Sequence, residues 1–298
     1  MIKTNCTPIP KNASAQEILD KANLNWRVKR SPRFFFHSGK FVEVPGKYSL
    51  LRTDRVEELT TAPENWQNSQ NQDIVAVFHQ FAQDAGITLT HAGPLNGGKQ
   101  ICLIGDLEKE YDVQKVGDIT HCYLQLIGSH ECGVGHQVRI LAERLVCTNG
   151  ATRKVVQHKQ VLRHSPDVLQ LLQQGLTLAV QEWEGLCEDH ELLADTPMDQ
   201  SQAAMLLIES FGYPEKGLEE QPPVVQTALQ LFDGQLIGGH LLSVYKTAYG
   251  LLQSVTEYYG HHHRWRNSTD HFASLTIGSV ANQVRRFERQ LVGVSNHG

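Results

Sequence analysis

The chain has 298 residues, 40% of them hydrophobic and 20% charged, which is enough apolar material for one large domain or two moderate ones. No run of about 18 apolar residues is present, so the sequence excludes a membrane-spanning helix. The formal net charge of −5 argues against a nucleic-acid-binding protein, but it averages over strong local differences. Residues 1–55 hold 11 basic and 4 acidic side chains (+7), residues 121–164 hold 6 and 2 (+4), and residues 165–233 hold 1 and 13 (−12).

Aromatic and β-branched segments dominate the first part of the chain. Ser14 stands three residues before Glu17, the spacing of a capping box, and predicts a short helix over 14–24. Residues 26–54, interrupted by turn sequences, predict two or three short strands. Apolar residues at positions 74, 77, 78, 81 and 85 follow the helical period and predict a helix over 70–86.

The middle of the chain changes from strand to helix patterning. Residues 87–107 predict a hairpin around Asn-Gly-Gly, and residues 121–128 and 136–150 predict two further strands. Residues 165–214 are helical, with Ser165 and Pro166 as the expected start, and helices continue to the end. This order predicts an α+β fold: an antiparallel sheet with an embedded helix in residues 1–164, and a helical region over 165–298 that packs on the sheet or extends from it.

Basic and aromatic side chains alternate along the predicted strands of residues 26–55. Single-stranded nucleic acid is held by such a mixture, because cations follow the phosphates while rings stack on bases. The alternative is an ordinary sheet with buried rings and solvated cations. With two arginines from the second basic block, the candidate contacts are Trp26, Arg27, Lys29, Arg30, Arg33, Phe35, Lys40, Lys47, Arg52, Arg55, Arg139 and Arg144.

Two other segments carry side chains suited to chemistry. His130, Cys132, His136 and Cys147 lack the paired spacing of a structural zinc site, so we expect no metal and no cofactor. Glu257 and His261 lie four residues apart on a predicted helix, where they could form an acid–base couple or a surface pair favoured by the helix dipole. Catalytic candidates are therefore Glu257, His261 and His130, with a structural role for the helical pair as the alternative.

Several segments, in this order, resemble one family. They are NLNWRVKRSPRFF, VPGKYSLLRTD, HAGPLNGGKQICLIGDL, RILAERLVCTNG and KTAYGLLQSVTEYYGHHHR. The chain is similar over about residues 20–290 to the phage/plasmid-like protein family, domain of unknown function 932. Glu131 and Thr148 depart from its pattern, whereas His130 and Asn149 match it. The resemblance implies a cytoplasmic protein of mobile elements and, by analogy of fold and setting, a likeness to phage single-strand annealing proteins.

These observations favour a non-enzymatic, homo-oligomeric protein that binds single-stranded DNA and promotes annealing or recombination. Scattered cysteines without a Cys-x-x-Cys pair agree with a cytoplasmic protein. Two alternatives stay open. One is an enzyme acting on nucleic acid through Glu257, His261 and His130, and the other is an anti-host or assembly protein that binds partners through the acidic residues 165–233.

Overall fold

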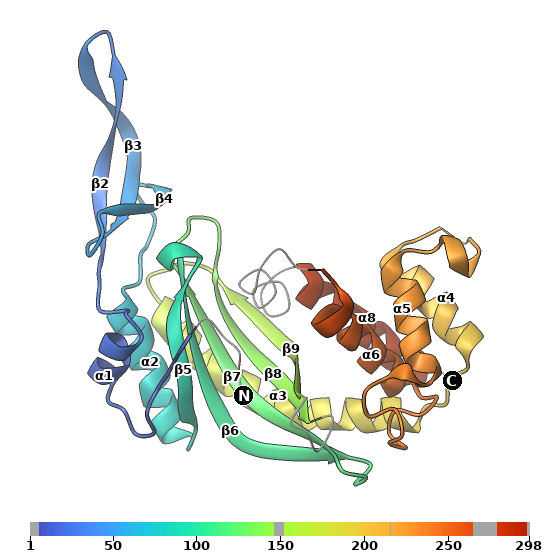
Figure 1. Cartoon of the computed structure of the whole chain (residues 1–298). Helices are drawn as coiled ribbons and strands as arrows, with labels where there is room; N and C mark the ends of the chain where they lie inside the picture. The colour runs from blue at the N-terminus through green and yellow to red at the C-terminus, as the bar shows by residue number, and fades with distance from the viewer. Residues whose placement is uncertain (1–5, 146–151, 215, 265–278, 297–298) are drawn as a thin grey trace.

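The computed structural model describes residues 6–145, 152–214, 216–264 and 279–296, with side chains described outside 144–158. Its centre is a curved, fully antiparallel six-stranded sheet in the order β1-β5-β6-β7-β8-β9 (Figure 1). The strands are β1 (Thr7–Pro8), β5 (Thr88–Leu95), β6 (Gln100–Val113), β7 (Asp118–Ser129), β8 (His136–Leu145) and β9 (Thr152–Leu162).

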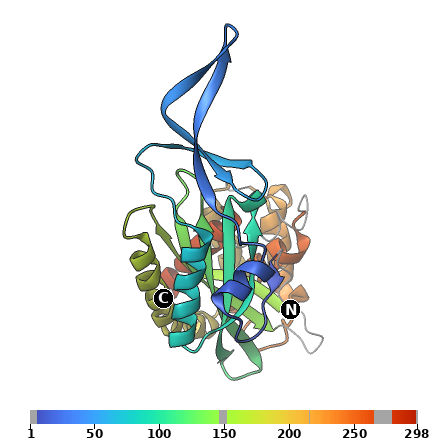
Figure 2. The same ribbon diagram turned by 90° about the vertical axis from the view of Figure 1, so that its left-hand side faces the viewer.

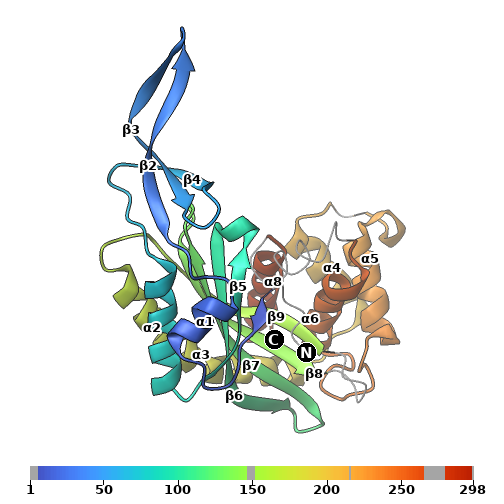
Figure 3. The same cartoon turned by 60° about the vertical axis from the view of Figure 1, so that its left-hand side comes forward.

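Three helices cover the outer face of this sheet: α1 (Ala15–Lys21), α2 (Asn71–Asp84) and α3 (Val168–Asp195) (Figures 1 and 3). The capping box of α1 is present, because the Ser14 hydroxyl accepts from the Glu17 N–H at 3.3 Å and the Glu17 carboxylate accepts from the Ser14 N–H at 2.8 Å. The apolar stripe of α2, including Ile74, Phe78 and Phe81, is buried against the sheet. The apolar face predicted from the helical period is therefore the face of α2 that packs in the core.

A second, three-stranded sheet stands apart from the first. Its strands are β2 (Val28–His37), β3 (Lys40–Arg52) and β4 (Glu57–Pro63), in the order β2-β3-β4. The β2–β3 hairpin projects from the body of the molecule (Figures 1 and 2). Because β4 pairs only with residues 47–52 of β3, the outer part of the hairpin is a two-stranded ribbon. We call residues 29–47 the arm.

The second half of the chain is helical. It contains α4 (Gln200–Phe211), α5 (Pro223–Gln230), α6 (Ala248–Glu257) and α8 (Ser279–Ser295). Single turns η1 (Asn96–Gly98) and η2 (Leu218–Glu220) are 3-10 helical, and η3 (Leu231–Gln235) and η4 (Tyr258–His262) are π-helical. Among the described residues, none of the helices has the length and apolar character needed to cross a membrane.

Two hydrophobic cores meet along α3. The first joins the large sheet to α1 and α2, and α3 adds Leu172, Leu176, Ala179 and Trp183 to it. The second joins α4, α5, α6 and α8, and the far end of α3 adds Leu193 and Ala194. The predicted boundary between residues 164 and 165 therefore falls before a helix that belongs to both cores.

The expected α+β class is confirmed, as are the two helices predicted over 14–24 and 70–86, which are α1 and α2. Two details of the prediction are wrong. Helix α3 begins at Val168 with Asp167 as its N-cap, and not at Ser165 and Pro166. The strands of residues 26–54 are long, because β2 and β3 pair from Val28–Arg52 out to His37–Lys40.

Candidate nucleic-acid interface

The arm exposes aromatic rings on both faces. Register pairs Phe36 with Phe41 and Phe35 with Val42, so these two cross-strand pairs lie on opposite faces of the ribbon. The rings of Phe36 and Phe41 meet edge to face with centroids 5.3 Å apart. The exposed fractions of Phe34, Phe35, Phe36 and Phe41 lie between 49% and 77%. Within the described residues this is an unusual density of exposed rings, and such patches mark interaction surfaces.

Cations accompany these rings. Between residues 29 and 47 the chain has five basic side chains and one acidic side chain, a net charge of +4. Lys29, Lys40 and Lys47 are exposed. Arg30 donates to the carbonyls of Glu64, at 2.8 Å, and Trp66, and so anchors the arm to the chain that follows β4.

Arg33 lies where the arm meets β4. It donates to the Thr61 hydroxyl and lies 4.0 Å from the Glu58 carboxylate, although its side chain is still 41% exposed. The arm therefore presents its lysines freely, while its arginines also hold it to β4.

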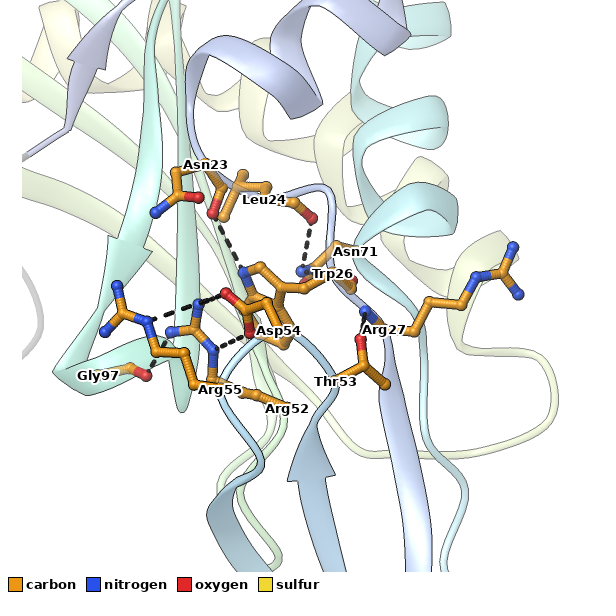
Figure 4. A network of polar contacts seen from close by, with 10 residues as sticks. All are labelled: Asn23, Leu24, Trp26, Arg27, Arg52, Thr53, Asp54, Arg55, Asn71 and Gly97. Carbon is orange, nitrogen blue, oxygen red and sulfur yellow. Dashed lines mark hydrogen bonds and ion pairs between the residues drawn. The ribbon is translucent and has the colours of Figure 1, made fainter.

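A buried polar cluster holds the base of the arm (Figure 4). Arg52 is 1% exposed and its guanidinium lies over the Trp26 ring, 4.3 Å from the centroid. It donates to both carboxylate oxygens of Asp54, at 3.0 and 2.7 Å, and to the Gly97 carbonyl at 2.7 Å. These bonds hold the pKa of Asp54 below its usual value. Arg52 therefore joins β3 to the turn between β5 and β6.

Glycine is required at this turn. Gly98 has φ +96°, and a Cβ there would lie 2.5 Å from Nη1 of Arg52. The Asn-Gly-Gly turn predicted from the sequence thus also makes room for the guanidinium.

The same base connects the arm to α2. Buried Asn71 donates to the carbonyls of Leu24, at 2.9 Å, and Trp26, at 3.3 Å, while its Oδ1 accepts from Nε2 of His130 at 2.8 Å. Two expected nucleic-acid contacts, Trp26 and Arg52, are therefore corrected: both side chains are buried within the protein and are not on its surface. Arg27 and Arg55 are exposed beside this base.

The two arginines of the second basic block are not part of the arm. Arg139 is buried on β8 in the large sheet, so it is not a surface contact. The side chain of Arg144, also expected to contact nucleic acid, lies outside the described residues.

The three catalytic candidates are divided between the two halves of the fold. His130 follows β7 and packs edge to face against Trp26, with centroids 5.4 Å apart. Glu257 ends α6 in the helical half, where its carboxylate accepts from the Ile237 N–H at 3.0 Å. The structure therefore gives no single site that combines His130 with the helical pair.

A π-helical turn, η4, begins directly after Glu257 and contains His261 and His262. In a π-helical turn, residues five positions apart lie on the same face of the helix. The Glu257 carboxylate therefore lies 3.7 Å from Nε2 of His262. At the other end of α6, Thr247 caps the helix by accepting from the Gly250 N–H at 3.1 Å. A Cβ on Gly250 would lie 1.9 Å from the Val244 carbonyl. The distinctive residues of this segment thus have evident structural roles.

Three histidines lie near the base of the arm. His136 accepts from the Ser129 N–H at 3.2 Å, and its ring lies 4.5 Å from that of His164, which in turn lies 4.4 Å from Trp66. Burial lowers the pKa of His130 to about 4 and that of His136 to about 3. Both imidazoles are therefore neutral near pH 7.

Three members of the zinc set considered from the sequence, His130, Cys132 and His136, lie within the described residues. Cys132 is exposed whereas His130 and His136 are buried, and Cys147 lies outside the described residues. Within the described ranges, no group of three or more His, Cys, Asp or Glu side chains is arranged to hold a metal ion.

Part of the acidic segment is used inside the protein. Glu191 on α3 accepts from the Tyr111 hydroxyl and, at 3.0 Å, from the Gln114 N–H. Asp195 accepts from the Gln114 amide at 2.8 Å. These acids tie α3 to the β6–β7 turn, so residues 165–233 are not simply a free acidic face.

The fold and this interface define an α+β protein that presents a basic, aromatic β-arm. The chain belongs to the family described as Domain of unknown function (DUF932), whose model matches residues 58–277. The arm, and the two resembling segments at 23–35 and 44–54, precede the matched region. Comparisons with curated proteins and with solved structures gave no significant match.

Proposed function

We propose that this protein binds single-stranded DNA through the arm. The observation that carries the proposal is the exposure of Phe34, Phe35, Phe36 and Phe41 on both faces of the two-stranded ribbon, within an arm (residues 29–47) whose net charge is +4. Aromatic stacking contributes roughly 1–3 kcal/mol per base and suits any base sequence. Two faces of rings allow bases from one strand to stack on either side while the lysines neutralise phosphates.

We extend this proposal to four further properties: strand annealing, homo-oligomerisation, a cytoplasmic location and an association with mobile elements. An arm that holds a strand by its bases and phosphates concentrates it for pairing, and several arms in one assembly would hold a longer strand. Mixing two complementary labelled oligonucleotides with the protein, and following duplex formation by energy transfer, tests the annealing part.

The binding test uses a fluorescently labelled oligothymidylate and fluorescence anisotropy at low salt. Phe36→Ala and Phe41→Ala should each weaken binding by roughly 5- to 150-fold, corresponding to the loss of one stacked base. Met205→Ala is the matched control, because Met205 is 70% exposed on α4 and distant in sequence from the arm. Its affinity should equal that of the wild type.

A salt titration tests the electrostatic part. Lys40→Gln should reduce the slope of log K against log salt by about 0.7, the value for one phosphate contact on a single strand. The proposal is wrong if the wild-type protein leaves the oligonucleotide free at low salt, or if both phenylalanine variants bind as well as Met205→Ala.

A further inference from the structure

Arg139 lies in a cross-strand row on the inner face of the large sheet. Its strand neighbours Val138 and Ile140 point into the core with the outer helices, so alternation directs Arg139 to the opposite face. Register places Gln125 of β7 beside it on one side and Lys159 of β9 on the other. Side chains directly opposite each other on neighbouring strands are in contact range.

The guanidinium of Arg139 is buried with most of its donors unused. Arg139 is 0% exposed, and Nη2 donates to the Gln137 side-chain oxygen, whereas Nε and Nη1 have no acceptor among the residues that the structure describes. Its neighbours Gln125 and Gln137 are neutral amides. A buried charge without a counter-ion is strongly disfavoured, and buried unsatisfied donors in a native fold call for an explanation such as a bound ion.

Helix α8 brings a third cation to this row. Ala281 of α8 packs against Leu141, two residues from Arg139 on the same face of β8. Arg285, one turn further along α8, donates to the Asn282 side chain at 2.8 Å. Burial, and to a smaller extent the positive charge of Arg285, lowers the pKa of Arg139 to about 9.

The pKa of Lys159 is lowered for similar reasons. Burial and then the two arginines lower its pKa to about 8. Like charges therefore disfavour the charged forms of Arg139 and Lys159, whereas the pKa of Arg285 is lowered by burial and then by Arg289 and is raised by Glu288.

We propose that Arg139, Lys159 and Arg285 bind the phosphate group of a ligand between β8, β9 and α8. A phosphate supplies several acceptor oxygens and up to two negative charges, which match the two unused donors of Arg139 and the excess of cations. The phosphate could belong to a free phosphate compound or to a nucleic-acid backbone. This site stands independently of the arm.

Thermal unfolding in sodium phosphate, against sodium chloride at equal ionic strength, tests the site. Wild-type protein should gain roughly 5 °C in Tm when phosphate reaches about a hundredfold of its Kd. Lys159→Gln and Arg285→Gln should lose this gain. Arg286→Gln, the exposed neighbour on α8, should retain it.

Arg139→Met separates binding from a structural role. In phosphate-free buffer this variant should be at least as stable as the wild type, because it removes an unpaired buried charge, and it should not respond to phosphate. A variant less stable than the wild type in phosphate-free buffer, or a wild-type Tm unaffected by phosphate, pyrophosphate and oligonucleotide alike, would overturn the proposal.

The source of the phosphate is resolved with the double variant Phe36→Ala/Phe41→Ala, in which the arm is disabled. A Tm gain from inorganic phosphate or pyrophosphate that an oligonucleotide does not reproduce identifies a free phosphate compound. A gain from the oligonucleotide that Lys159→Gln abolishes identifies the nucleic-acid backbone. Each result supports the site whatever the arm binds.

Discussion

Replacing Arg52 by alanine should be one of the most damaging single changes in this protein. The substitution removes the bidentate bond to Asp54, the bond to the Gly97 carbonyl and the stacking over Trp26. Asp54 is 32% exposed, so water replaces part of what its carboxylate loses. The buried contacts dominate the loss: a charged hydrogen bond contributes about 1.5–3 kcal/mol and a desolvated cation–π contact about 2 kcal/mol.

We therefore expect Arg52→Ala to lower the free energy of unfolding by about 3.5–5 kcal/mol, a large part of the 5–15 kcal/mol typical of folded domains. Arg52→Lys should lie between the wild type and Arg52→Ala, since an ammonium keeps the charge but cannot fill the fork. Urea unfolding followed by tryptophan fluorescence measures the change.

Arg55→Ala is the matched control. Arg55 lies 3.9 Å from the same carboxylate, but its side chain is 59% exposed, so its loss should cost at most about 1 kcal/mol. Equal losses for Arg52→Ala and Arg55→Ala would refute the argument that burial makes the Arg52 contacts strong.

Two further predictions concern the histidines and Glu257. The folded-state pKa values of His130 and His136, about 4 and about 3, lie below the usual value of 6.5. The unfolded chain therefore binds more protons at acid pH than the folded protein does. The stability that the two neutral histidines contribute is complete above pH 6.5 and is lost as the pH falls toward 4 for His130 and 3 for His136. The loss is about 1.4 kcal/mol per pH unit for each histidine. Glu257→Ala should cost about 1–3 kcal/mol because it leaves the Ile237 N–H without its acceptor, whereas Glu257→Gln keeps an acceptor and should cost less.

Urea unfolding at a series of pH values checks the first of these predictions. His130→Gln should show a shallower loss between pH 6.5 and 4 than the wild type, while His37→Gln, at the exposed end of the arm, should follow the wild type. Identical pH profiles for all three proteins would contradict the assignment to buried histidines. For Glu257, a glutamine variant as unstable as the alanine variant would show that the hydrogen bond from the Ile237 N–H does not account for the loss of stability.

Local patterns were sufficient for most of the fold. The apolar period of α2, the capping box at Ser14 and the Asn-Gly-Gly turn act over a few residues, and each formed where the sequence predicts. The exposure of the arm depends on a segment further along the chain, namely β4. Strand alternation shows which residues share a face, but whether that face is covered depends on how far β4 extends along β3.

A signal for the arm was nevertheless present. Three consecutive phenylalanines, Phe34 to Phe36, place rings on both faces of one strand, which a half-buried strand cannot accommodate. Arg139 offered no such signal. A cation in an alternating strand is usually solvated, and Arg139 is buried on a face against which α8, more than a hundred residues later in the chain, packs. The ion pair of Glu257 with His262 likewise depends on the π-helical turn after α6.

The sharing of α3 between two cores has a consequence for synthesis. The sheet strands are complete at residue 162, but the first core closes only with Leu172, Leu176, Ala179 and Trp183 of α3. A nascent chain that has emerged only as far as β9 therefore exposes the apolar outer face of β7 and β8, and is open to aggregation or chaperone capture until about twenty more residues appear. The end of the same helix then provides the first surface on which α4, α5, α6 and α8 can assemble, so the order of translation is also an order of assembly.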